Sequence, residues 1–142
     1  MPVRKADAEW SGSLREGSGK VKLGSGAFEG SYSFGSRFEN AKGTNPEELL
    51  GAAHAGCFSM ALAAGLGRAG FEPKRVHTTA TVHIDKVGAA FEITKIELDC
   101  DAQVPNIDEN LFHAEATAAK EGCPLSKALK ATPIVLRARL VP

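Results

Sequence analysis

The residues SRFENAKGTNPEELLGAAHAGCFSMAL (36–62) carry the strongest structural signal in the chain, because they predict one long helix with almost no charge on it. Asn45 can cap the N-terminus of that helix, and Pro46 suits its first helical position. Glu47 and Glu48 then occupy the first turn, where the helix dipole favours negative charge. The signals at this end predict a helix that begins at residue 46.

The predicted helix, residues 46–69, is apolar on nearly all sides. Its apolar and small residues recur at a spacing of four: Leu49, Ala53, Cys57, Ala61 and Gly65. The opposite face carries little charge before Arg68, and Gly70 can end the helix. A helix of this kind is normally buried, so we expect it inside the fold or against a partner.

Alternating segments on both sides of the helix predict strands. Before it, residues 6–11 and 20–24 have period two and are separated by glycines, which predicts two or three short antiparallel strands. An irregular segment, residues 32–38, is expected to follow and to carry Arg37. After the helix, residues 74–104 predict a hairpin that turns at 86–89 and carries a bulge near Thr94.

The C-terminal part predicts two more helices and a last strand. Asp108 can cap a helix over 108–121, and a short helix over 124–130 would have Cys123 at its N-cap. Residues 134–140 alternate again, which predicts a strand. The expected fold is therefore a single α+β domain over residues 1–142.

Composition excludes several classes of function. The 17 Lys and Arg balance the 17 Asp and Glu, which argues against binding to nucleic acid or to an acidic membrane surface. No run approaches ~18 apolar residues, so no membrane-spanning helix is expected. The N-terminal MPVRKADAEW lacks the apolar stretch of a signal peptide, and the expected location is the cytoplasm.

The three cysteines lie in three different settings. Cys100 falls on the apolar side of its strand, which predicts a buried structural thiol. Cys57 is either a core residue or a nucleophile, and a nucleophile would need a nearby cation to lower its pKa. His54 lies one turn back on the same face, and Arg37 precedes the helix. Cys123 either faces unpaired backbone N–H groups that favour a thiolate or merely precedes Pro124.

Other chemistries lack the residues they need. There is no C-x-x-C motif, and His77 and His83 lie about 20 Å apart along one strand, so no zinc site is expected. Glycine-rich phosphate loops and a serine nucleophile elbow are also absent. A cysteine hydrolase that uses Cys57 and His54 remains as a rival, although no third orienting residue is visible.

Four segments together resemble the OsmC/Ohr family of thiol-dependent hydroperoxide reductases. They are residues 36–62, GFEP (70–73), DKVGAAFEITKIEL (85–98) and KEGCPLSKALKA (120–131). The likeness extends from Trp10 to Leu140, and AHAGC (53–57) is closer to the OsmC branch than to the Ohr branch.

The resemblance implies a fold and a site. The fold would be an intertwined homodimer, with antiparallel β-sheets wrapped around central helices and active sites at the subunit interface. Cys57 would be the peroxidatic cysteine and Cys123 the resolving cysteine. Arg37 would be the active-site arginine, and Glu47 its carboxylate partner.

The activity implied is the reduction of organic hydroperoxides, and more weakly of hydrogen peroxide, in response to oxidative or osmotic stress. The Cys57 thiolate would become a sulfenic acid, Cys123 would condense with it, and a dithiol donor such as a lipoyl protein would reduce the disulfide. No cofactor or metal is required. Phe58 and Met60, beside Cys57, would suit an organic substrate. The rival class is a non-enzymatic, stress-associated dimer with incidental thiols.

The spacing of Glu47 and Cys57 adds one geometric expectation. The two residues are ten positions apart, about 15 Å along a continuous helix. An intact helix would therefore keep Glu47 away from the Cys57 of its own chain. We expect Glu47 to reach the Cys57 site mainly from the partner subunit.

Overall fold

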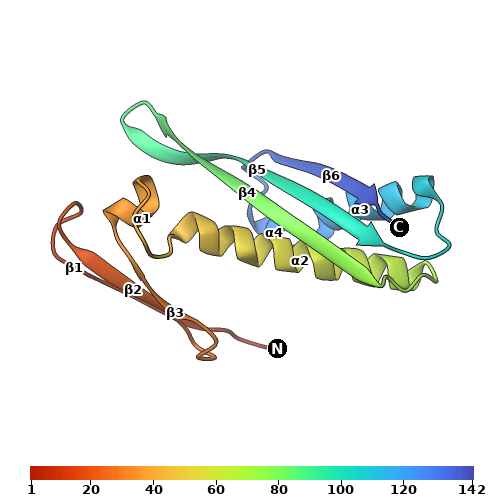
Figure 1. Ribbon diagram of the computed structural model, residues 1–142, viewed down its shortest axis with the longest axis horizontal. Helices are drawn as coiled ribbons and strands as arrows, with labels where there is room; N and C mark the ends of the chain where they lie inside the picture. The colour runs from red at the N-terminus through yellow and green to blue at the C-terminus, as the bar shows by residue number, and fades with distance from the viewer. The chain divides into compact units, whose positions relative to one another are not determined.

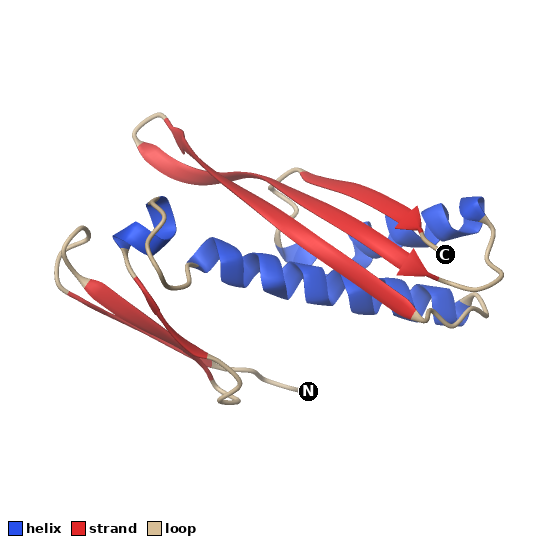
Figure 2. Cartoon of the chain, viewed as in Figure 1, coloured by secondary structure: helices blue, strands red, loops and turns tan.

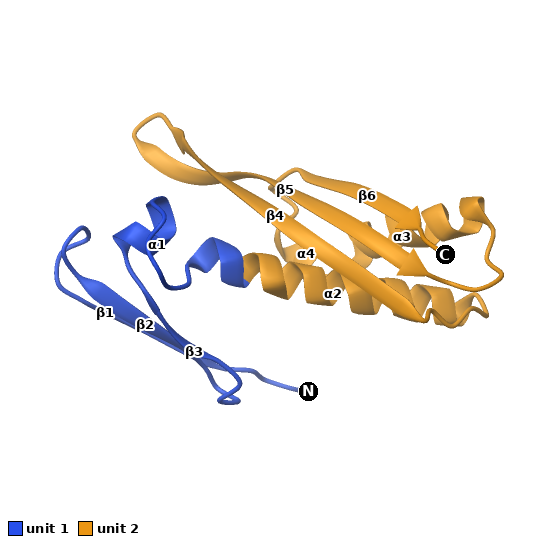
Figure 3. Ribbon diagram, viewed as in Figure 1, with its two compact units in different colours: residues 1–49 blue, residues 50–142 orange.

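The computed structural model describes all residues, Met1–Pro142, and has the α+β composition that the sequence predicts (Figures 1 and 2). The elements follow the order β1–β2–β3–α1–α2–β4–β5–α3–α4–β6. The chain divides into two compact units, residues 1–49 and residues 50–142, which are described separately below (Figure 3). The single domain over 1–142 stays a prediction.

The first unit contains a three-stranded antiparallel sheet, which confirms the prediction of short strands before the helix. Its strands are β1 (Ala6–Ser11), β2 (Ser18–Leu23) and β3 (Glu29–Tyr32), in that order. Gly19 pairs with Trp10 on one side and Tyr32 on the other. A Cβ on Gly19 would lie 2.5 Å from the Tyr32 ring, so glycine leaves the space in which the two rings meet.

The segment that follows β3 is a short helix, α1 (Phe34–Phe38), and the expectation of an irregular segment was wrong. Ser33 and Ser36 form a reciprocal capping box at its start. A capping box usually has Glu or Gln three residues after the N-cap residue. Ser36 occupies that position here, which gives a weaker sequence signal.

The long helix α2 (Pro46–Arg68) begins where the sequence predicts, because the Asn45 side-chain oxygen accepts a hydrogen bond from the Glu48 backbone at 2.7 Å. It ends one residue before the predicted limit. Gly70 has a φ of +91°, and the Phe71 backbone N–H donates to the Leu66 carbonyl at 2.9 Å. This is a Schellman ending, which requires the left-handed conformation that glycine allows.

The second unit contains β4 (Arg75–Val87), β5 (Ala90–Gln103) and β6 (Ile134–Leu140), in that order. The β4–β5 hairpin turns at 88–89, and its register shifts so that Thr94 has no partner residue, which confirms the predicted bulge. The final strand pairs with β5 in parallel, so the expectation of purely antiparallel sheets was wrong. The long connection through two helices makes the parallel return possible.

Those two helices are α3 (Glu109–Gly122) and α4 (Pro124–Ala128). The Asp108 side chain caps α3 by accepting hydrogen bonds from the backbone N–H groups of Asn110 and Leu111. Cys123 caps α4 as predicted, although α4 ends two residues earlier than expected.

Helices α2, α3 and α4 lie on one side of the β4–β5–β6 sheet and enclose the core of this unit (Figure 2). The alternation predicted for β5 is confirmed, since its inward residues are buried. The buried apolar residues are Phe58, Leu62, Leu66, Ile96, Leu98, Cys100, Ala102, Val104, Phe112, Ala116, Ala119 and Cys123.

The other side of α2 is exposed on this chain, so the fold itself covers only one face of a helix that the sequence places inside the fold or against a partner. Between residues 49 and 66 the exposed residues are all apolar or small: Ala52, Ala53, Gly56, Met60 and Ala64. By length and composition α2 is also apolar enough to span a membrane, contrary to expectation, because an 18-residue window within it has a mean hydropathy of 1.6. Core helices of soluble proteins have the same composition, and the inner face of α2 packs on a sheet.

Candidate active site

The fold brings together the two thiols that the sequence singled out. Cys57 comes from the middle of α2, and Cys123 comes from the junction of α3 and α4, 66 positions later. The two thiols interact directly, and both are in the free form. Cys123 is 1% exposed, whereas Cys57 is partly exposed. The partly exposed thiol is therefore the one a small substrate can approach.

The immediate surroundings of Cys57 do not favour a thiolate. Burial raises the pKa of the Cys57 thiol, and the neighbouring Cys123 thiol raises it further. A hydrogen bond from the Leu125 backbone opposes these effects but does not outweigh them. The thiolate is the reactive form, so the site needs a cation that the apolar core around Cys57 does not supply.

His54 does not supply that cation. The side chain is fully buried, and its Nε2 atom lies 2.8 Å from the Ser126 hydroxyl. Burial lowers the pKa of His54, so the imidazole is neutral at neutral pH. Its Nδ1 atom has no hydrogen-bond partner. His54 is therefore not the cation that Cys57 needs, and neither of its ring nitrogens bonds to Cys57, so the hydrolase rival lacks the Cys57–His54 pair that it requires.

Cys123 lies at the helix junction that the sequence indicated. Its sulfur accepts a hydrogen bond from the Ser126 backbone N–H at 3.3 Å, and the Ser126 hydroxyl lies 3.1 Å from the same sulfur. Of the two alternatives for Cys123, this hydrogen bond supports the one in which the thiol faces a backbone N–H group. Cys100, by contrast, is fully buried on β5, and burial raises the pKa of its thiol, as expected of a structural cysteine.

The first unit holds the other two predicted residues, and it pairs them. The Arg37 guanidinium donates from Nε and Nη2 to the Glu47 carboxylate at 3.0 Å and 2.8 Å. Glu47 is 7% exposed, whereas the Arg37 side chain is 37% exposed. Nε also donates to the second carboxylate oxygen at 3.3 Å, and the three hydrogen bonds fix the plane of the guanidinium and leave Nη1 for another partner.

The loop between α1 and α2 is tied down by polar contacts that fix this pair. The Ser36 hydroxyl donates to the Thr44 carbonyl at 2.7 Å, and the Asn45 amide donates to the Ser36 carbonyl at 3.1 Å. Thr44 also donates its backbone N–H to Ser31 at 2.9 Å. Asn45 therefore both caps α2 and anchors the helix that carries Arg37.

An aromatic pocket in the first unit was missed by the sequence reasoning. It has a volume of about 400 Å³ and contains Arg37 on its lining. Its aromatic residues are Trp10, Tyr32, Phe34 and Phe38. Trp10 packs against Tyr32 and Phe34 against Phe38, with ring centroids 5.3 Å and 5.0 Å apart. The aromatic density of YSFGSRF (32–38) was the available signal.

Phe58 and Met60, expected beside the substrate, lie elsewhere. Phe58 is fully buried in the core, and Met60 is 76% exposed on the outer face of α2. Phe58 follows Cys57 directly, and one helical step turns it about 100° away from Cys57 and into the core.

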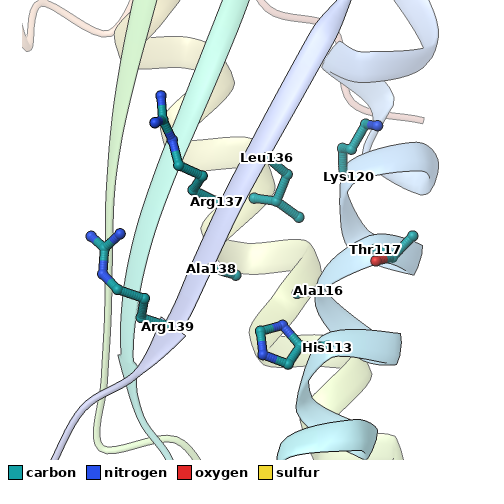
Figure 4. A pocket seen from close by; sticks show the side chains of 8 residues that line it. All are labelled: His113, Ala116, Thr117, Lys120, Leu136, Arg137, Ala138 and Arg139. Atoms are coloured by element: carbon teal, nitrogen blue, oxygen red, sulfur yellow. The ribbon is translucent and has the colours of Figure 1, made fainter.

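A cavity between α3 and β6 has a volume of about 540 Å³ and several basic residues (Figure 4). Arg137 and Arg139 point away from His113 and Lys120 of α3 in this view. Arg139 pairs with Asp101 at 2.8 Å, and Arg137 pairs with Glu97 at 3.4 Å. Both arginines of this cavity already form ion pairs, and they do not converge with the side chains of α3. The cavity is therefore not a candidate active site.

Comparison with known proteins identifies the family of the chain. The OsmC-like protein family matches residues 39–137. Peroxiredoxin OsmC of Escherichia coli (strain K12) is 52% identical over 129 residues, which cover 90% of each chain, and the protein of that name from Shigella flexneri matches equally.

Solved structures with the same fold are more distant in sequence. An OsmC like protein from Mycoplasma pneumoniae has a TM-score of 0.76 at 17% identity and covers 99% of both chains. The organic hydroperoxide resistance protein OhrB of Bacillus subtilis has a TM-score of 0.72 at 23% identity, over 96% of this chain and 98% of its own. The fold, the extent of the family match and the identity to its curated relatives show that the chain belongs to the OsmC family.

Proposed function

We propose that this protein is a cysteine-based peroxidase that reduces organic hydroperoxides, and more weakly hydrogen peroxide, without a cofactor. The contact between the free thiols of Cys57 and Cys123 carries the proposal. It is supported by the 52% identity to proteins named Peroxiredoxin OsmC and by the fold shared with an organic hydroperoxide resistance protein. A non-enzymatic dimer would give no reason for two distant cysteines to meet in the core.

The proposed reaction proceeds in three steps. The Cys57 thiolate attacks the terminal peroxide oxygen, the O–O bond breaks, and the alkoxide leaves and takes a proton to form the alcohol. Cys57 is then a sulfenic acid. The Cys123 sulfur attacks the sulfenic sulfur, the S–O bond breaks, and a disulfide and water form. An external dithiol, such as a lipoyl protein, reduces that disulfide by exchange.

Arg37 is the cation that this reaction needs. A guanidinium next to Cys57 would stabilise the thiolate and would orient the peroxide through its free Nη1 group. Glu47 holds Nε and Nη2, so it would fix the direction in which Nη1 points. The Arg37–Glu47 pair therefore acts as one positioning unit for the reaction at Cys57.

The substrate class follows from the surroundings of Arg37. A pocket that combines four aromatic side chains with one guanidinium suits a molecule with an apolar body and a polar peroxide end. Hydrogen peroxide has no apolar body and would gain nothing from the rings. Organic hydroperoxides are therefore the preferred substrates.

The protein would act as a homodimer in the cytoplasm, in the response to oxidative or osmotic stress. The exposed, uncharged face of α2 is the surface that a second copy would cover. Helix α2 is unbroken from Pro46 to Arg68, so it holds Glu47 away from the Cys57 of its own chain. Glu47 would therefore act on the Cys57 site of the partner. Each active site would then combine the thiols of one chain with the Arg37–Glu47 pair of the other.

The thiol chemistry is tested by treating the reduced protein with one equivalent of cumene hydroperoxide and mapping its cysteines by mass spectrometry. We expect a Cys57–Cys123 disulfide with Cys100 still reduced. Turnover with a dithiol donor should disappear in Cys57→Ser and persist in Cys100→Ser, because only Cys57 meets the peroxide. Full turnover by Cys57→Ser would refute the enzyme.

The role of the Arg37–Glu47 ion pair is tested by Glu47→Gln, with Glu48→Gln as the matched control. A hydrogen-bonded charge is worth about 1.5–3 kcal/mol, so Glu47→Gln should lower kcat/KM for cumene hydroperoxide roughly 10- to 100-fold. Glu48 is exposed and contacts Thr44 instead of Arg37, and its variant should stay within about twofold of the parent. Equal losses in the two variants would show that the Arg37 contact is irrelevant.

The substrate pocket is tested by Phe34→Ala, with Phe28→Ala as the control outside the pocket. Loss of the Phe34 ring should lower the ratio of kcat/KM for cumene hydroperoxide to that for hydrogen peroxide by about tenfold, because only the organic substrate uses its apolar surface. Phe28 is 38% exposed and does not line the pocket, so its removal should leave the ratio unchanged. An unchanged ratio in Phe34→Ala would place the substrate elsewhere.

A further inference from the structure

A chain of buried polar side chains lies behind Cys123, and the two-thiol reaction does not account for it. His54 is 0% exposed and Ser126 is 4% exposed, in a core that is otherwise apolar. The His54 Nε2 atom lies 2.8 Å from the Ser126 hydroxyl, which lies 3.1 Å from the Cys123 sulfur. Three elements meet here, because His54 belongs to α2, Ser126 to α4, and Cys123 to the junction before α4.

The surroundings of His54 determine which atom donates in each hydrogen bond of the series His54–Ser126–Cys123. The Nδ1 atom of His54 is buried and has no partner. An unpaired buried N–H group is rarer and more costly than an unpaired acceptor, so the single ring proton belongs on Nε2. His54 therefore donates to the Ser126 oxygen. The one hydroxyl proton of Ser126 is then directed at its other neighbour, the Cys123 sulfur.

Two donors consequently meet at one sulfur. The Ser126 hydroxyl donates from 3.1 Å, and the Ser126 backbone N–H donates from 3.3 Å. Hydrogen bonds to the charged form of a group favour that form, so this arrangement favours a thiolate at Cys123. It does so inside a core where a bare thiolate would otherwise be strongly disfavoured.

We propose that His54 and Ser126 are positioning residues that hold two donors against the Cys123 sulfur and thereby stabilise Cys123 as a thiolate. The inference rests on the proposed function only in assigning Cys123 as the resolving cysteine. The stabilised thiolate serves the cycle twice, once as the attacking group and once as the leaving group.

The electrons and protons balance in both steps. In disulfide formation the Cys123 thiolate supplies the electron pair of the S–S bond, and the S–O bond of the Cys57 sulfenic acid breaks. The hydroxide that leaves combines with the proton Cys123 had released, and water forms. In reduction, a thiolate of the external dithiol attacks the Cys57 sulfur, and Cys123 leaves with the electron pair of the S–S bond.

Other titratable groups also surround Cys123. Cys57 and Arg68 face it from α2, and Glu115 faces it from α3, across a cavity of about 220 Å³ that Cys123, Arg68 and Glu115 line. Cys100 of β5 belongs to the same core. Burial lowers the pKa of His54, so its ring stays neutral and its direction of donation does not change near neutral pH.

The ionisation of Cys123 tests the proposal without any peroxide. In a Cys57→Ser background, the rate of iodoacetamide labelling of the Cys123 peptide is measured by mass spectrometry as a function of pH. Adding Ser126→Ala should move the midpoint up by about one pH unit or more, which is at least a tenfold loss of thiolate at neutral pH. Ser59→Ala, which removes a hydroxyl bonded to Thr78 at 2.7 Å in the same unit, should leave the midpoint in place.

Two variants at His54 separate hydrogen bonding from simple packing. The amide of His54→Gln can donate to Ser126 as Nε2 does, whereas His54→Leu cannot. We expect the midpoint to rise in His54→Leu and to return toward the parent value in His54→Gln. This pair also decides the matter if Ser126→Ala does not fold, as judged by its thermal unfolding. Equal midpoints in His54→Leu and His54→Gln, or in folded Ser126→Ala and Ser59→Ala, would overturn the proposal.

A single-turnover measurement with Cys57 intact links the proposal to the reaction. Ser126→Ala should form the Cys57 sulfenic acid at the parent rate and should form the disulfide at least about tenfold more slowly, with the difference vanishing at high pH. An unchanged rate of disulfide formation would contradict the role of Ser126. Failure of the proposed function would look different, since the parent protein itself would then form no sulfenic acid, while the Cys123 titration would remain readable.

Discussion

The contact between the Cys57 and Cys123 thiols is the feature on which the proposed chemistry depends. It requires α2 to lie along the β4–β5–β6 sheet with the Cys57 side turned inward, and it requires α3 to stop at Gly122. Pro124 then starts a new helix, and the residue between the two helices is turned toward the core. Ordinary helix endings and apolar packing thus bring together two thiols that are 66 positions apart.

The same packing creates a chemical problem. Burial raises the pKa of Cys57, and the nearest imidazole, that of His54, is neutral and turned toward Ser126. The cation that we propose for this chemistry, Arg37, belongs to the first unit, where a buried Glu47 pairs with it and it lines an aromatic pocket. A thiol of raised pKa is slow to react until such a cation arrives, so activity would depend on assembly of the complete site.

Local signals predicted much of this correctly. The Asn45 cap, the bulge at Thr94 and the Cys123 junction depend on residue types at fixed offsets, and the structure confirms all three. Features that depend on distant segments were missed: the parallel pairing of β6 and the aromatic pocket. The partner of His54 belongs to this group, because helical spacing places the ring near Cys57 but cannot reveal Ser126, 72 positions away.

The most direct test of the account is complementation between two inactive variants, Cys57→Ser and Arg37→Ala, refolded together in equal amounts. Random pairing makes about half of the dimers mixed, and a mixed dimer would contain one complete site if the Arg37–Glu47 pair serves the Cys57 of its partner. We predict recovery of about a quarter of the parent activity from the mixture. No recovery from a mixture shown to contain mixed dimers would contradict a site shared between two chains.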